Sequence, residues 1–114
     1  MATQKQEFVF RASFLKKLIA VSEEQPTAVQ LYLKILVNAN THQRKVNDIV
    51  VERGQIALRF KTEKVFFNTS GKRFRKDRFY LVQKGLIETN RLHGMTILTV
   101  CNYDVIVKPL MSGL

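Results

Sequence analysis

The stretch formed by residues 71–100 restricts the fold of this chain more than any other part of the sequence. Its first half, up to Lys84, is rich in arginine and lysine and has apolar residues at helical spacing. Gly85 follows directly, and glycine commonly ends a helix. Two runs with the composition of β-strands come next, residues 86–90 and 95–100, with a tip at residues 92–94. The stretch therefore predicts a basic helix that runs into a two-stranded β-hairpin.

The positive charge of the chain is concentrated in the same region. Formal net charge is +10 over 114 residues. Residues 59–91 hold 10 basic and 3 acidic side chains, residues 1–58 hold 8 and 5, and residues 92–114 balance at zero. Such an excess favours a polyanionic partner, with nucleic acid first and an acidic membrane surface second. The alternative is a solvated basic surface without a partner.

Length and composition place the chain in a broad class. We expect one domain over residues 1–114, with tails at residues 1–9 and 105–114. The single cysteine, Cys101, excludes an internal disulfide, and its apolar neighbours predict a buried, unreactive thiol. No apolar run is long enough to cross a membrane, and the N-terminus lacks a signal-peptide core, so we expect a cytoplasmic protein. Two distant histidines suggest no metal site, and no catalytic set is recognisable, so we expect neither an enzyme nor a bound cofactor.

The first part of the chain predicts two helices and a strand. Residues 10–21 have helical apolar spacing, and Thr27 is a suitable N-cap for a second helix over residues 28–40. This second helix is apolar almost all round, which is typical of a central core helix. Residues 49–51 are β-branched, Arg53 and Gly54 predict a turn, and residues 55–60 alternate as a strand does. A short helix at residues 63–68 and a turn at residues 69–71 would then form a helix-turn-helix with the basic helix.

The basic helix divides into two faces. Phe74 and Leu81 fall together, with Val82 and Phe79 to one side, and this is the expected core face. Arginine and glutamine can read guanine and adenine edges, while lysine and the tyrosine hydroxyl reach phosphates or base edges. The candidate DNA contacts are therefore Arg73 and Lys76 to bases, Lys72 and Lys84 to phosphates, Tyr80 and Gln83 along the same line, and Arg91 and His93 at the hairpin tip. The simpler alternatives are a solvated helix face and, for His93, a loop residue without a role.

One arginine conflicts with this division. Arg78 falls between Phe74 and Val82, on the face that should be buried. Because an unpaired buried guanidinium is costly, three alternatives remain open. The side chain extends past Phe74 to water, it pairs with Glu88 or Asp77, or the helix register is displaced by one residue.

Three separated segments resemble the N-terminal domains of bacteriophage replisome organisers and DnaD-like primosomal proteins. Residues 32–40 are similar to that family's leucine-rich helix ending in Ala-Asn, residues 52–56 to its strand beginning with Arg-Gly-Gln, and residues 96–104 to its wing strand ending in Asn-aromatic-Asp. Residues 84–88 also resemble a common winged-helix ending. The resemblance implies a winged helix that acts at replication origins or primosomes, for DNA binding in some members and for self-association in others.

Together these patterns predict an α+β winged helix-turn-helix with two N-terminal helices, a short strand, the helix-turn-helix and a two-stranded wing. The expected function is double-stranded DNA binding through the basic helix and wing, in replication initiation or in maintenance of a phage or mobile element. A transcriptional regulator of the same fold and a protein-interaction module without DNA binding are the alternatives. The expected partners are DNA, replication proteins and a second copy of the chain through residues 28–39, but no membrane.

Overall fold

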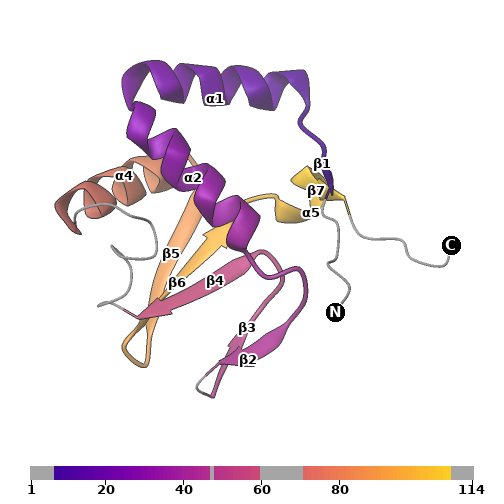
Figure 1. The fold of residues 1–114 in the computed structure, drawn as a ribbon, viewed down its shortest axis with the longest axis vertical. Coiled ribbons are helices and arrows are strands. Elements are labelled where there is room, and N and C mark those ends of the chain that lie inside the picture. Colours follow the sequence, from indigo (N-terminus) through magenta and orange to yellow (C-terminus); the bar gives the residue numbers. More distant parts are fainter. Residues whose placement is uncertain (1–6, 47, 60–70, 109–114) are drawn as a thin grey trace, which may run out of the picture.

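The structure is a computed structural model that describes residues 7–46, 48–59 and 71–108 (Figure 1). The predicted helix at residues 63–68 and most of the turn after it lie outside these ranges. The elements in chain order are β1 (Glu7–Phe8), α1 (Ala12–Glu24), α2 (Pro26–Asn38), β2 (Arg44–Val46), β3 (Ile49–Val51), β4 (Gln55–Arg59), α4 (Gly71–Gln83), β5 (Ile87–Leu92), β6 (Met95–Val100), α5 (Tyr103–Ile106) and β7 (Val107–Lys108). They form a compact α+β domain.

The predicted hairpin follows the basic helix and belongs to a three-stranded antiparallel sheet. Its strand order is β4–β6–β5, so β6 is central and β5 lies at the edge. Gly85 ends α4 with a positive φ of 72°, as predicted, and its amide donates to the Val82 carbonyl. β5 and β6 then pair from Ile87–Val100 to Leu92–Met95, which leaves His93 and Gly94 as a two-residue turn. Both turn residues have positive φ, as tight hairpin turns commonly require.

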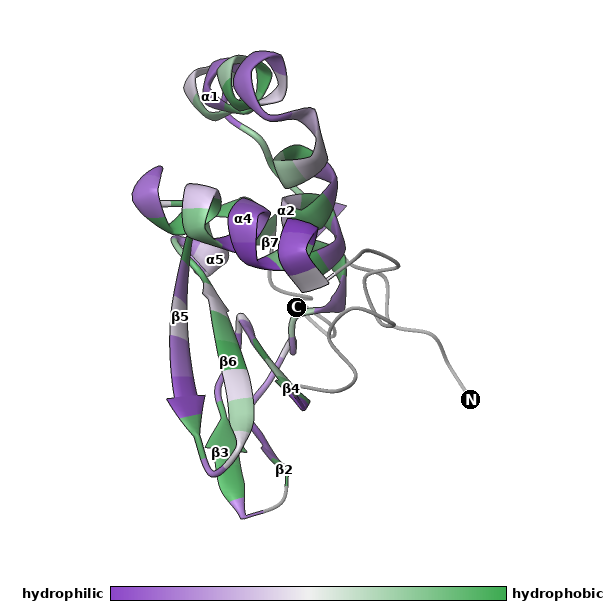
Figure 2. Ribbon diagram, turned by 90° about the vertical axis from the view of Figure 1, so that its left-hand side faces the viewer, coloured by the Kyte–Doolittle hydropathy of each residue, from purple (hydrophilic) through white to green (hydrophobic). Residues whose placement is uncertain are grey.

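The main core lies between the helices and one face of this sheet. In Figures 1 and 2 the three long helices gather at one end of the molecule, and the strands extend away from them. Helix α2 is central, as its apolar sequence predicts, because it buries five side chains against its neighbours: Ala28, Leu31, Tyr32, Ile35 and Leu36. The sheet contributes Leu58, Leu98 and Val100. The N-cap prediction at Thr27 is wrong, because Pro26 opens the helix and Gln25 takes the N-cap position.

A second, smaller core covers the other face of the sheet. Ile49 and Val51 of β3 pack on Met95 and Ile97 of β6. Alternate residues of a strand point to opposite faces, so β6 is buried on both sides. Strand β2 pairs with β3 from Arg44–Val51 to Val46–Ile49, although no strand was expected there. Arg44 and Lys45 are charged and exposed, and only Val46 is apolar and half-buried, so the pairing with β3 rather than the local sequence forms the strand.

Residues 7–9 and 105–108 of the expected tails are structured, and residues 1–6 and 109–114 lie outside the described ranges. Glu7 pairs with Lys108 and Phe8 with Val107 in a short antiparallel ladder, and the Val9 amide donates to the Ile106 carbonyl. The apolar Ile106 and Val107 side chains are buried in the main core, which holds α5 and β7 against it. No helix among the described residues is long and apolar enough to cross a membrane.

Candidate nucleic-acid interface

Helix α4 buries a stripe formed by Phe74, Asp77 and Leu81. Phe74 and Leu81 were expected in the core, and this prediction is confirmed. Phe79 was expected beside them, and this prediction is wrong, because its side chain is 63% exposed. The reason is the orientation of the helix about its axis. The buried stripe is centred near Asp77, so Phe79 lies on the opposite, outward side.

Asp77 determines this orientation through hydrogen bonds to the start of α2. Gln25 Nε2 and Thr27 Oγ1 both donate to Asp77 Oδ1, each at 3.0 Å. The carboxylate is only 2% exposed, and these two donors compensate for part of its lost hydration. Asp77 is the only acidic residue of α4, so its burial removes the single negative charge from the outward surface of the helix.

The outward surface of α4 is consequently basic. Lys72, Arg73, Lys76 and Gln83 are all exposed, as the DNA-binding prediction requires. Arg75 is exposed as well, and the sequence analysis did not include it among the candidates. It lies one turn from Phe79 on the outward side, so centring the core face on Asp77 would have identified it. Figure 2 shows hydrophilic bands along α4 and over most of the edge strand β5.

A hollow of about 300 Å³ separates the start of α2 from the first turns of α4. It is lined by Gln25, Thr27, Lys72, Arg73 and Lys76. Three cationic side chains beside two polar ones form a suitable environment for an anionic group such as a backbone phosphate. Gln25 and Thr27 were not predicted as part of the site, since only the packing of α2 on α4 brings them there.

Two of the candidate contacts also take part in packing within the protein. Tyr80 is half-buried, and its side chain packs against the main core. Loss of hydration, together with the neighbouring Glu24 carboxylate, raises the pKa of its hydroxyl. Lys84 Nζ lies 3.6 Å from Glu24 Oε1 and 5.4 Å from the Tyr80 ring centroid. Tyr80 and Lys84 therefore join the end of α4 to the end of α1.

The position of Arg78 decides among its three alternatives. Its guanidinium carbon lies 5.5 Å from the centroid of the Phe74 ring, and the residue is half-buried. The side chain thus extends past Phe74 towards water and stacks on the ring as a cation does. A displaced register is not needed, because Phe74 and Leu81 occupy the core.

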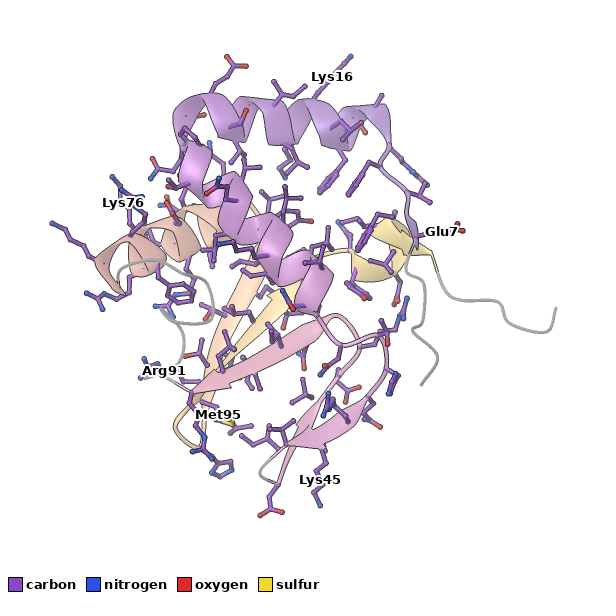
Figure 3. All side chains as sticks on the ribbon, viewed as in Figure 1. Glu7, Lys16, Lys45, Lys76, Arg91 and Met95 are labelled. Atoms are coloured by element: carbon purple, nitrogen blue, oxygen red, sulfur yellow. The ribbon has the colours of Figure 1, made fainter. Side chains whose placement is uncertain are left out.

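The hairpin tip supplies the remaining candidates. Arg91 near the end of β5 and His93 in the turn are both exposed. Figure 3 shows Arg91 on the same side of the molecule as Lys76 of α4. The helix and the hairpin thus present basic side chains to a common side, although they belong to separate elements.

The segments that carry the family resemblance meet in space, away from this surface. The Gly54 amide donates to the Asn40 carbonyl at 2.7 Å, and the Asn40 amide donates to the Gln55 carbonyl at 2.9 Å. These bonds join the end of α2 to the turn before β4. Their role is structural, because they satisfy backbone groups at the end of a helix.

The Asn-Tyr-Asp segment completes this junction. Arg53 Nε donates to Asp104 Oδ1, and its Nη1 donates to the Thr41 carbonyl. Its guanidinium carbon also lies 4.9 Å from the centroid of the buried Tyr103 ring. The three resembling segments therefore converge on one structural junction, which no pattern of spacing in the sequence indicates.

Other reactive groups give no second site. Cys101 is half-buried, and loss of hydration raises the pKa of its thiol, so the thiol stays protonated near neutral pH. Within residues 7–46, 48–59 and 71–108, no three His, Cys, Asp or Glu side chains are grouped so that they could hold a metal ion.

Comparisons of the chain with protein-family models, with curated proteins and with solved structures give no match.

Proposed function

We propose that the protein binds double-stranded DNA through the outward face of α4 and the tip of the β5–β6 hairpin. One observation carries the proposal. Helix α4 exposes Lys72, Arg75 and Lys76, while its only acid, Asp77, is buried by hydrogen bonds to α2. Because exposed acids would repel a phosphate backbone, their complete absence from this helix face favours a polyanionic partner.

The arrangement of elements supports a winged helix-turn-helix as the finer description of the fold. The order α2, β4, α4 and the β5–β6 hairpin is that of a winged helix, with α4 as the recognition helix and the hairpin as the wing. A DNA major groove about 12 Å wide admits one α-helix. In this arrangement Lys72, Arg73 and Lys76 enter first, and Gln83 follows on the outward face. Arg91 and His93 reach the adjacent backbone or minor groove.

The resemblance to replisome organisers favours replication initiation, or maintenance of a phage or mobile element, as the process, with replication proteins as further partners. A transcriptional regulator would use the same surface, since a fold does not fix the process. Selection of target sequences from a random library, followed by their location relative to origins and promoters, separates the two.

Salt dependence tests the DNA-binding proposal directly. Five exposed cations lie on α4 and the hairpin, Lys72, Arg73, Arg75, Lys76 and Arg91. If each neutralises one phosphate, the logarithm of the association constant falls with the logarithm of salt concentration with a slope of about −4.5. Fluorescence titration of 20–30 base-pair duplexes at several salt concentrations measures this slope.

Matched variants localise the effect. Lys76→Gln is expected to reduce the slope by about one unit. Lys45→Gln removes an equal charge from the exposed side of β2 and should leave the slope unchanged. Equal losses in both variants would assign binding to general charge rather than to α4, and no binding at low salt would refute the proposal.

Self-association is the second candidate function, and one observation favours it. Leu33 is 40% exposed and Val37 is 53% exposed, one turn apart on the outward side of α2. Light scattering at high protein concentration tests for a dimer, and Val37→Asp should dissociate one formed through α2. A monomer at every concentration would exclude this function.

A further inference from the structure

Phe79 is the most exposed large apolar side chain in the described part of the chain, at 63%. It lies in the second half of α4, opposite the stripe of Phe74, Asp77 and Leu81 that faces the core. The described residues give it no contact with another aromatic ring, and it is not among the side chains that pack on either core. The fold therefore gains little from a phenylalanine here, which leaves the ring available to a partner.

The surroundings of Phe79 are basic. Arg75 and Lys76 precede it by one helical turn, Lys72 by two turns, and Gln83 follows by one turn. All four side chains are exposed. An isolated ring within a cationic surface is poorly suited to an apolar protein groove, which would need apolar neighbours on the helix. It is suited to nucleic acid, where bases are aromatic and every base is flanked by phosphates.

The chemistry of the ring distinguishes paired from unpaired bases. Bases in a duplex present only their edges in the grooves, so a phenyl ring there reaches little more than a thymine methyl group. An unpaired base presents its whole face, and stacking on an aromatic side chain contributes about 1–3 kcal/mol per base. We propose that Phe79 stacks on an unpaired base, so that α4 binds strand-separated DNA more tightly than intact duplex. This inference rests on the proposed DNA-binding function, because the basic side chains of the same helix hold the phosphates.

A comparison of three DNA molecules tests the inference. They are a 30 base-pair duplex, the same duplex with a central bubble of mismatched bases, and one of its single strands. Wild-type protein is expected to bind the bubble and the single strand about 5- to 150-fold more tightly than the duplex, which is the stacking contribution expressed as a ratio. Phe79→Ala should lose most of this preference and keep its duplex affinity within about twofold.

Two further variants complete the design. The chain contains no tryptophan, so Phe79→Trp introduces a single tryptophan, whose emission can be excited selectively, at the position in question. Its emission should be quenched by the bubble and the single strand, but hardly by the duplex, and the affinity preference should be retained. Ile19→Ala removes an apolar side chain of α1 that is 57% exposed and lies outside the proposed DNA-binding surface, and it should leave the preference unchanged. Thermal melting of each variant checks that the fold is intact.

The outcomes separate the inference from the function on which it rests. Duplex binding without a preference for unpaired bases refutes the inference alone. A preference that survives in Phe79→Ala also refutes it, because another residue must then provide the stacking. Failure to bind any of the three DNA molecules refutes both proposals and would leave a protein partner as the occupant of this surface.

Discussion

Gly54 offers the sharpest test of the junction between α2, β4 and α5. Its φ is +82°, a region in which a residue with a side chain is strained. A Cβ atom added here would lie 2.8 Å from both Cβ and Cγ of Tyr103. These are the inner atoms of a side chain that is only 5% exposed, so they cannot move away easily.

We expect Gly54→Ala to lower the free energy of unfolding by about 2–5 kcal/mol. The left-handed backbone contributes about 1–2 kcal/mol, and forcing an extra carbon into a packed site contributes about 1–3 kcal/mol. Urea denaturation followed by circular dichroism measures the change, with the slope of the transition used to check two-state behaviour.

Gly85→Ala and Gly94→Ala are matched controls. These glycines also have positive φ, at +72° and +75°, but a Cβ would meet nothing within 4 Å. Each should cost only the backbone contribution of about 1–2 kcal/mol. If Gly54→Ala were no more destabilising than these two variants, the close contact with Tyr103 would be refuted as a source of stability.

Four other substitutions are expected to change stability, each measured by chemical denaturation. Asp104→Asn should lower the free energy of unfolding by less than about 1 kcal/mol, because Asp104 is largely exposed. Arg53→Ala should lower it by about 1–3 kcal/mol, because this variant also loses the contacts with the Thr41 carbonyl and the Tyr103 ring. Equal losses in the two variants would contradict this account. Asp77→Ala should cost about 1–3 kcal/mol by leaving two donors without an acceptor, and a neutral result would contradict the role of Asp77 in orienting α4. Tyr32→Phe should raise stability by up to about 1 kcal/mol, since the Tyr32 hydroxyl is buried without a hydrogen-bond partner in the described residues.

The Tyr32→Phe variant also tests how the stability of the protein depends on pH, when the denaturation is repeated at alkaline pH. Burial raises the pKa of Tyr32 above its ordinary value of 10.0. At neutral pH the hydroxyl is protonated in both the folded and the unfolded protein, so it causes no pH dependence there. As the pH rises above about 10, the unfolded protein releases this proton and the folded protein retains it, so stability falls. The phenylalanine variant should lose less stability over this range, and equal losses would contradict the assignment.

The sequence alone determined the elements whose signals are local. Gly85 ends α4 and the hairpin follows it, because glycine chemistry and strand alternation act within a few residues. The apolar sequence of α2 required a central position, and Phe74 and Leu81 of α4 required burial. The sequence also predicted the concentration of basic residues on α4. The structure exposes four of the side chains expected to face outward, Lys72, Arg73, Lys76 and Gln83.

The tertiary structure decided what depends on distant partners. Helical periodicity gives the relative directions of side chains, but the packing partner fixes the rotation of the helix about its axis. Asp77 is buried and Phe79 is exposed because Gln25, just before α2, and Thr27 in its first turn donate hydrogen bonds to α4. The packing of α4 against its neighbours also places Lys84 beside Glu24 of α1.

Strands with weak local signals follow the same principle. β2 and the β1–β7 pair form because buried residues elsewhere hold their partners in place, and their own short sequences carry little strand preference. The junction of Arg53, Tyr103 and Asp104 joins residues about 50 positions apart, a separation at which no periodicity operates. Sequence thus determined which elements form near the candidate site, and long-range contacts determined which of their side chains it presents.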